Sequence, residues 1–249
     1  MYHNLLFEIL QPKINPEFDM QAIILCGGRG ERLRPITKNI PKPMVIINKK
    51  PFLEHQIMFL SNNGFKNFVF CVGYLWNSIF DYFGDGSRFG VNIAYSIEKK
   101  LLGTGGALKI AAKFLEQDFF IVYGDSFLPI NYQVIYEKAK KINKIGVIIV
   151  YNNKEDTNVR SNIVLNQEGL VRKYSKINLD ENMRYVDAGV SIFKKKVLNF
   201  IPSGKKVSLE NDIFKKLINI NELSSIKTNQ RFYDIGTPER LKQIGKVLQ

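Results

Sequence analysis

The feature that most constrains the fold is an alternation of short apolar runs with helical patterns over residues 21–151. Continuous apolar runs such as "NFVFCV" and "FFIVY" predict buried strands, and the amphipathic segments between them predict helices. We expect strands at residues 21–26, 67–72, 91–96, 119–123 and 144–151, and helices at 52–63, 105–115 and 132–142. This βαβ order predicts an α/β fold with a mixed, mostly parallel central sheet flanked by helices on both faces.

From residue 152 onward the pattern changes to shorter β-like pieces, "SNIVLN", "LVRKYSKI" and "RYVDAGVSIF". A helix over residues 209–219, a short strand before Arg231 and a closing helix with Pro238 in its first turn follow. We interpret this part as an extension of the same sheet. The predicted organisation is an N-terminal extension (1–19) and one domain (20–249).

Composition restricts the partners of the chain. The net charge is +13 over 249 residues, but the lysines are scattered and no nucleic-acid-binding motif is present, so we expect anionic small ligands and no nucleic acid. No apolar run approaches the roughly 20 residues that span a bilayer, and the first residues lack signal-peptide features. Cys26 and Cys71 lie in apolar runs, as reduced core thiols do. We expect a cytoplasmic protein with no membrane partner; the sequence leaves a homo-oligomeric state open.

A glycine-rich loop, "CGGRG", directly follows the first predicted strand. Glycines in this position let backbone N–H groups approach phosphate oxygens. The loop lacks the Gly-Lys-Ser/Thr ending of a P-loop. It also departs from the dinucleotide pattern G-x-G-x-x-G, because Leu33 stands at the third glycine position. We therefore expect a phosphate-binding loop of another class, at the carboxyl end of a parallel strand where ligands of such sheets bind.

The residues that follow the loop make it specific. Arg32 can direct its guanidinium at phosphate oxygens, and Lys42 is held between two prolines in "PKPM". The segment resembles the signature of the sugar-1-phosphate nucleotidyltransferases, GGxGTRLxPxTxxxPKPM, with Glu31 in place of its threonine. Further motifs continue the resemblance in order: "LLGTGGAL", "YGDS", "YVDAGVSIF" and "FYDIGTPERL". The resemblance covers almost the whole chain from Met20 and implies the Rossmann-like fold of the nucleotide-diphospho-sugar transferase type. It also implies that the single domain has a nucleotide-binding half (20–150) and a sugar-binding half (151–249).

The resemblance also implies roles for individual residues. A sugar 1-phosphate would attack the α-phosphorus of an NTP and release pyrophosphate, with Mg²⁺ as cofactor. The implied catalytic residues are Arg32, Lys42 and Asp125. The implied nucleotide-binding residues are Leu25, Gly27, Gly28, Gly30, Glu98, Gly103, Thr104 and Gly105. Sugar-phosphate binding falls to Asp187, Gly189 and Lys176, and Asp125 and Asp234 would hold the metal.

Several of these residues have an ordinary structural alternative. Asp125 and Asp234 are also typical turn or helix caps, although a pair of carboxylates suits Mg²⁺, which completes its octahedron with waters and phosphate oxygens. Thr104 is a candidate helix N-cap, and Gly189 a candidate β-bulge position. Lys173 competes with Lys176 for the sugar phosphate. Asn211 and Asp212 are further candidates for lining the sugar pocket.

Glu98 is the residue that bears on the choice of base. A carboxylate only accepts hydrogen bonds, and guanine offers two adjacent donors where uracil and thymine offer one. This favours GTP with a heptose or mannose 1-phosphate, as in the guanylyltransferases that the chain most resembles. A uridylyl- or thymidylyltransferase for a hexose 1-phosphate is the alternative.

Two more distant function classes are weighed against this prediction. A metal-dependent glycosyltransferase also uses a nucleotide-binding sheet, but a DxD motif is absent around Asp125. A non-catalytic nucleotide-sugar sensor would be expected to lose charged site residues. Arg32, Lys42, Asp125 and Asp234 are all present, so the enzyme remains the favoured class.

Overall fold

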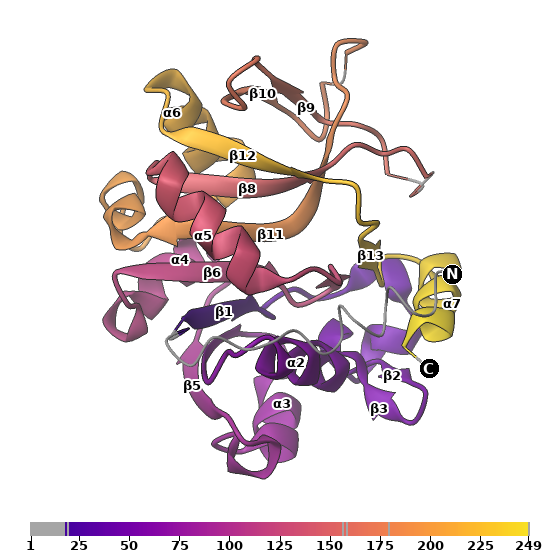
Figure 1. Ribbon diagram of the computed structural model, residues 1–249. Helices are drawn as coiled ribbons and strands as arrows, with labels where there is room; N and C mark the ends of the chain where they lie inside the picture. The colour runs from indigo at the N-terminus through magenta and orange to yellow at the C-terminus, as the bar shows by residue number, and fades with distance from the viewer. Residues whose placement is uncertain (1–17, 19, 156, 158, 179, 249) are drawn as a thin grey trace.

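The fold is organised by a seven-stranded sheet with the strand order β12-β8-β11-β6-β1-β4-β5 (Figure 1). The computed structural model describes residues 18, 20–155, 157, 159–178 and 180–248. The strands of this sheet are β1 (Gln21–Leu25), β4 (Asn67–Val72), β5 (Asn92–Ile97), β6 (Asp118–Tyr123), β8 (Gly146–Tyr151), β11 (Val186–Lys194) and β12 (Leu223–Thr228). The predicted α/β fold with a mixed, mostly parallel sheet is confirmed.

Strand direction brings distant segments to one edge of the sheet. Four pairings are parallel, β1 with β4 and β6, β4 with β5, and β8 with β12. β11 runs antiparallel to both of its neighbours, β6 and β8. Its first residue, Val186, therefore pairs with Tyr151 at the carboxyl end of β8. Residues at the start of β11 consequently lie at the same edge as residues that follow β1 and β6.

Helices cover both faces of the sheet, because successive strand residues face opposite sides. Ala22 and Ile24 of β1 belong to one buried apolar cluster, and Ile23 belongs to the other. The first cluster includes side chains of α2 (Phe52–Asn62), α3 (Trp76–Phe83), α5 (Tyr132–Ile142) and α7 (Pro238–Val247). The second includes α4 (Gly103–Ile110) and α6 (Phe214–Asn219). In Figure 1, α2 and α5 lie in front of the sheet.

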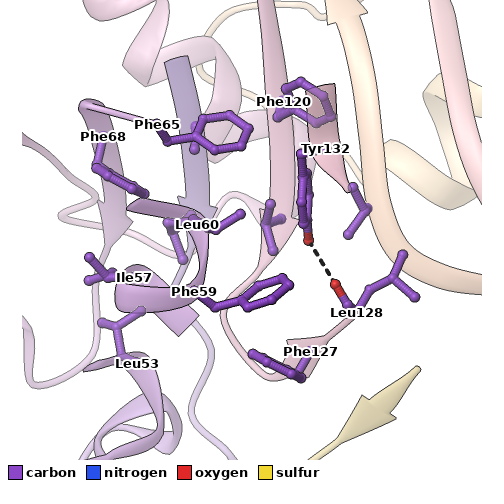
Figure 2. Packing of buried hydrophobic residues seen from close by; sticks show 14 of the residues in the cluster. Leu53, Ile57, Phe59, Leu60, Phe65, Phe68, Phe120, Phe127, Leu128 and Tyr132 are labelled. Carbon is purple, nitrogen blue, oxygen red and sulfur yellow. Dashed lines mark hydrogen bonds between the residues drawn. The ribbon is translucent and has the colours of Figure 1, made fainter. Parts of the chain in front are cut away.

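Aromatic side chains of α2, β6 and α5 pack together on one face of the sheet. Figure 2 shows Phe59, Phe65, Phe120, Phe127 and Tyr132 directed toward one another in this region. The rings of Phe59 and Phe127 have centroids 5.0 Å apart, and those of Phe65 and Phe120 are 5.1 Å apart in an edge-to-face arrangement. Such contacts anchor the segment after β6 against the core.

The second half of the chain differs from the prediction in one respect. β11 and β12 extend the main sheet as expected, but β9 (Ile163–Leu165) and β10 (Val171–Tyr174) form a separate antiparallel ribbon. The prediction that these pieces join the same sheet is wrong. The ribbon contacts β12 through an isolated bridge between Leu170 and Ser224 and through the Ser225 N–H, which donates to the Gly169 carbonyl at 2.9 Å, while β9 and β10 pair with each other.

Helix boundaries also required correction. The predicted helix at residues 105–115 begins earlier, at Gly103, and tightens into a 3₁₀ turn at Ala111. The predicted helix at 209–219 begins with a π-helical turn (Leu209–Ile213) before α6. Helix α3 was not predicted. Its eight residues follow Leu75, which has a left-handed conformation with φ of 52° and makes no side-chain cap.

The remaining elements are short. The paired strands are β2 (Ile46–Ile47) with β3 (Lys50–Pro51), and β7 (Ser126–Phe127) with β13 (Tyr233–Asp234). The 3₁₀ turns are η1 (Glu31–Leu33), η2 (Ile36–Lys38), η3 (Lys42–Met44), η4 (Ser87–Phe89), η5 (Ala111–Phe114) and η6 (Lys195–Phe200). Within the described part of the chain, no helix combines the length and apolarity that crossing a membrane requires. The predicted extension, residues 1–19, lies outside the described residues except for Phe18.

Candidate active site

The first cavity lies beyond the carboxyl ends of β1 and β6 and has a volume of about 370 Å³. Its position is the one expected for a ligand of a parallel sheet. Two loops form it, the glycine-rich loop after β1 and the loop that leads into α4. Its lining comprises Leu25, Cys26, Gly27, Gly28, Lys42, Pro43, Cys71, Glu98, Leu101, Gly103, Thr104, Ala107, Tyr123, Gly124, Asp125 and Lys206.

Each glycine of the loop is required, or tolerated, for a different structural reason. A Cβ at Gly27 would lie 2.6 Å from Glu98 Oε1, so glycine is required for Glu98 to occupy its position. A Cβ at Gly28 would meet no atom within 4 Å, which leaves the backbone there open toward a ligand. Gly30 has a φ of 64°, and its Cβ position lies 3.0 Å from Lys42 Cβ. Gly30 therefore turns the chain beside Lys42 and lies outside the cavity lining.

Glu98 is a buried acidic side chain on the wall of the first cavity. Its Oε2 accepts a hydrogen bond of 2.9 Å from the Leu102 N–H. Burial raises the pKa of Glu98, and this hydrogen bond opposes the rise. A bound base that donates hydrogen bonds to the carboxylate would favour its ionised form. The geometry thus presents an acceptor group to whatever base enters the cavity.

The start of α4 is tied to the loop that precedes η7, the π-helical turn. Gly103 has a φ of 76°, and a Cβ there would lie 2.6 Å from the Val207 carbonyl oxygen. The Gly105 N–H donates to the same carbonyl at 2.9 Å, so Gly105 packs against Val207 and lies outside the cavity lining. Thr104 is not the helix cap, because its hydroxyl donates to Glu210 Oε2 at 2.8 Å and accepts from the Leu209 N–H. Gly103 and Thr104 line the cavity.

Lys42 and Asp125 form an ion pair in the lining of the first cavity. Lys42 Nζ lies 2.5 Å from Asp125 Oδ2, and the lysine side chain is 10% exposed. Burial by itself would raise the pKa of Asp125, but Lys42, Ser126 and Arg32 together hold it below the ordinary value. The carboxylate is therefore ionised at neutral pH, with a lysine in place as its countercharge.

Asp125 and Asp234 are brought together by the pairing of β7 with β13, in which Asp234 pairs with Ser126. Gln56 of α2 fixes this turn, because its amide donates to the carbonyls of Tyr123 and Ser126 at 2.9 Å and 2.6 Å. Asp234 forms an ion pair with Arg240 of α7 at 3.0 Å. Each carboxylate thus has a cationic partner.

The two carboxylates can be tested as a metal site on their donor chemistry. Among the described residues, no cluster of three or more His, Cys, Asp or Glu side chains could enclose a metal ion. Mg²⁺ does not need such a cage, because it is bound by one or two carboxylates together with phosphate oxygens and waters. Asp125 and Asp234 both line the second cavity and match that donor set. The residues present therefore fit Mg²⁺.

The second cavity adjoins the first and has a volume of about 550 Å³. Tyr123 and Asp125 line both cavities, so these residues mark the boundary between them. Arg32 lies in the second cavity, whereas Lys42 lies in the first. The lining of the second cavity comprises Arg32, Tyr123, Asp125, Ser126, Val159, Arg160, Asn162, Lys176, Val186, Asp187, Gly189, Glu210, Phe232, Asp234 and Arg240.

Asp187 and Gly189 enter the second cavity from the start of β11. Asp187 Oδ1 accepts from the Gly189 N–H at 2.9 Å, and Oδ2 accepts from the Tyr174 hydroxyl at 2.8 Å. Burial raises the pKa of Asp187, although the Lys176 ammonium opposes this. Gly189 has a φ of 77°, and the register of β11 against β8 shifts between Asp187 and Ser191. Gly189 therefore occupies a bulge of β11 and also lines the second cavity.

Lys176, and not Lys173, reaches the second cavity. Lys176 Nζ lies 3.1 Å from Glu210 Oε1, whereas Lys173 pairs with Asp180 outside the cavity lining. Burial opposes ionisation of Glu210, but Lys176 and the Thr104 hydroxyl lower its pKa to about 2. Glu210 is thus a charged buried group that connects the α4 loop with the second cavity.

Sequence reasoning missed four of the charged residues in these linings. Glu210 lies in the cavity, whereas the neighbouring candidates Asn211 and Asp212 are exposed and lie outside the lining, which corrects that expectation. Glu210 offered only a helix-like pattern in the sequence, so nothing distinguished it from its neighbours. The other three missed residues are Arg160, Lys206 and Arg240. All the predicted site residues line one of the two cavities except Gly30 and Gly105.

The family model for nucleotidyl transferases matches residues 21–249. The chain belongs to the nucleotidyl transferase family. A D-glycero-alpha-D-manno-heptose 1-phosphate guanylyltransferase of Campylobacter jejuni is 33% identical over 220 residues, which is 88% of this chain and 96% of the relative. A protein of the same name from Aneurinibacillus thermoaerophilus is 30% identical over 231 residues, covering 92% of this chain and 99% of the relative.

Solved structures give the same result for the family fold. HddC from Yersinia pseudotuberculosis, complexed with GMP-PN, has a TM-score of 0.79 and 26% identity, and the match covers 92% of this chain and 100% of HddC. A UTP–glucose-1-phosphate uridylyltransferase of Synechocystis is 30% identical over 92% of this chain, which corresponds to 61% of that relative. The prediction that the chain is an NTP:sugar-1-phosphate nucleotidyltransferase is confirmed, while its relatives differ in base and sugar.

Proposed function

We propose that this nucleotidyl transferase forms a GDP-sugar and pyrophosphate from GTP and a heptose or mannose 1-phosphate. The observation that carries the choice of base is the Glu98 carboxylate on the wall of the first cavity. With Oε2 held by the Leu102 N–H, the carboxylate remains a group that only accepts hydrogen bonds when ionised. Guanine offers it adjacent donors. The guanylyltransferase relatives and the GMP-PN complex of HddC support the same choice.

The proposed reaction is an in-line displacement at the α-phosphorus of GTP. An oxygen of the sugar 1-phosphate forms a new P–O bond, and the bond from the α-phosphorus to the β-phosphate bridging oxygen breaks. Pyrophosphate leaves with that electron pair. The attacking oxygen is already anionic, so no general base is required. Catalysis then depends on bringing two anions together in the correct orientation and on neutralising their charge.

The cations of the two cavities have distinct places in this proposal. Lys42, in the first cavity, would bind the nucleotide phosphates after leaving Asp125. Arg32, in the adjoining cavity, would bind the part of the triphosphate that departs as pyrophosphate. Lys176 would bind the phosphate of the sugar 1-phosphate, and Asp187 would accept hydrogen bonds from sugar hydroxyls. This division is supported by the boundary at Tyr123 and Asp125.

Asp125 and Asp234 would hold Mg²⁺, since their number and chemistry suit it. When bound, the ion would neutralise phosphate charge and so favour the displacement. In its absence Lys42 helps to hold the pKa of Asp125 below the ordinary value, and Asp234 is paired with Arg240. Removal of divalent cations by EDTA should abolish turnover, and added Mg²⁺ should restore it. Unchanged turnover in EDTA would refute the metal assignment.

The decisive experiment is a pyrophosphate-release assay that crosses four NTPs with a panel of sugar 1-phosphates. The expected result is highest kcat/KM with GTP and either mannose 1-phosphate or the heptose 1-phosphate. Glu98→Gln should lower the preference for GTP over UTP. Equal preference in the wild type and the variant would remove the argument for guanine. Preference for UTP or dTTP with a hexose 1-phosphate would favour the alternative uridylyl- or thymidylyltransferase.

A further inference from the structure

Tyr123 ends β6 at the boundary of the two cavities and contains an unsatisfied polar group. Its backbone is fixed, because its carbonyl accepts a hydrogen bond from the Gln56 amide. Its hydroxyl is buried and has no hydrogen-bond partner among the described residues. Burying a hydroxyl without a partner lowers stability, and the exceptions in native proteins need an explanation. The location between the cavities indicates that the explanation concerns the ligands.

The surroundings of the Tyr123 side chain identify the groups on which it could act. Lys176 Nζ lies 5.7 Å from the centroid of the Tyr123 ring, within the range of a cation–π contact. Tyr123, Glu210 and Asp187 line the same cavity. Burial and the two nearby carboxylates raise the pKa of the Tyr123 hydroxyl, although that hydroxyl makes no hydrogen bond of ordinary geometry to either carboxylate. Asp187 already accepts hydrogen bonds from Tyr174 and Gly189. Tyr123 therefore lies against the Lys176–Glu210 ion pair with both its ring and its hydroxyl.

Lys176 and Glu210 differ in how far their side chains are exposed to solvent. The Lys176 side chain is 51% exposed and can turn toward an incoming anion, whereas Glu210 is 8% exposed and cannot follow. Glu210 Oε2 accepts from Thr104 and Ser208, and Oε1 accepts from Lys176. Movement of Lys176 onto a phosphate would leave Oε1 as a buried charged oxygen without its donor. Removing one partner of a buried ion pair is strongly unfavourable.

We propose that Tyr123 is a positioning residue that replaces Lys176 as the hydrogen-bond donor to Glu210 Oε1 when Lys176 binds the phosphate of the sugar 1-phosphate. The inference rests on the proposed role of Lys176. The proton stays on the tyrosine oxygen throughout, and no covalent bond changes. The unsatisfied hydroxyl in the ligand-free protein is thus a donor kept for the substrate-bound state, and the ring holds the ammonium close by until then.

The test is Tyr123→Phe, which removes the hydroxyl and keeps the ring. We expect the variant to keep or gain stability and to lose affinity for the sugar phosphate. The ligand-free variant should melt at the same or a higher temperature, because an unsatisfied buried group is gone. Its affinity for mannose 1-phosphate should fall about tenfold, the effect of one hydrogen bond to a charged group. The KM for mannose 1-phosphate should rise by the same factor, while the KM for GTP stays unchanged.

Tyr132→Phe is the matched control. Tyr132 is a buried tyrosine whose hydroxyl donates to the Leu128 carbonyl at 3.4 Å (Figure 2), and Tyr132 is in the lining of neither cavity. This variant should not gain stability, and its affinity for mannose 1-phosphate should equal that of the wild type.

The outcomes separate this inference from the proposed function. Binding of mannose 1-phosphate is measured by calorimetry with Mg²⁺ and a non-hydrolysable GTP analogue, so it does not require turnover. Equal affinity of wild type and Tyr123→Phe, or a lower melting temperature of the ligand-free variant, would overturn the role of Tyr123. Absence of pyrophosphate release by the wild type would overturn the proposed function instead, and the melting temperatures would still decide for or against the inference.

Discussion

Replacement of Gly189 by alanine should damage both the stability and the sugar side of the site. Gly189 has a φ of 77°, where an L side chain costs about 1–2 kcal/mol. The new Cβ would also lie 2.7 Å from Ser126 Cβ and Oγ. Relief of such an overlap in a packed region costs about 1–3 kcal/mol more. The free energy of unfolding should therefore fall by about 2–5 kcal/mol. The overlap also presses on the residue next to Asp125, so turnover should fall as well.

Gly90→Ala separates the two contributions. Gly90 has a similar φ of 68°, but a Cβ there meets no atom within 4 Å. Its cost should be the backbone term alone, about 1–2 kcal/mol, with pyrophosphate release unchanged. Urea unfolding of the wild type and both variants gives the free energies, and the release assay gives turnover. Equal destabilisation by the two alanines, or full turnover of Gly189→Ala, would refute the role assigned to the contact with Ser126.

Three further predictions concern other parts of the site. Asp125→Asn should lower turnover at least about a hundredfold, whereas Asp81→Asn, at an exposed position of α3, should leave it unchanged; near-normal turnover of the former would contradict its role. Because burial raises the pKa of Glu98, the KM for GTP should increase as the pH is lowered toward about 5, and a Glu98→Gln variant with the same pH profile would exclude this cause. Gln56→Leu removes two hydrogen bonds to the Asp125 turn and should lower the unfolding free energy by about 2–4 kcal/mol; an unchanged urea midpoint would count against that anchor.

The sequence predicted the edge of the sheet where the site lies. Asp125 follows a continuous apolar run, and the glycine-rich loop follows another, so the rule for parallel strands placed both at one edge. The two runs are the adjacent strands β6 and β1. Asp187 lies at the same edge because β11 runs antiparallel to its neighbours, which the apolar pattern does not predict. The pattern of "YVDAGVSIF" indicates a strand but carries no information about its direction.

Ion pairs between distant segments were not predictable. Glu210 and Lys176 are 34 positions apart in the sequence, and they meet where β10 packs against α6. Asp234 was predicted, but its partner Arg240 was not, since an arginine in the first turns of a helix is common on protein surfaces. The reason for Gly105 was also hidden, because it depends on contact with Val207, about a hundred residues later.

Because β11 runs antiparallel to its neighbours, the segment that leads to the sugar side of the site is different from the loops on the nucleotide side. Sequence changes in the two parts can therefore occur separately. The loops of the first cavity follow parallel strands and pack against one another. Gly27 leaves room for Glu98, and Lys42 pairs with Asp125. Asp187 and Gly189 instead lie at the start of β11, directly after a segment that begins after β8 and includes the β9–β10 ribbon. That segment can lengthen or change its residues without altering a crossover between parallel strands. Selection for a new acceptor sugar can therefore proceed in this segment while the donor nucleotide remains the same.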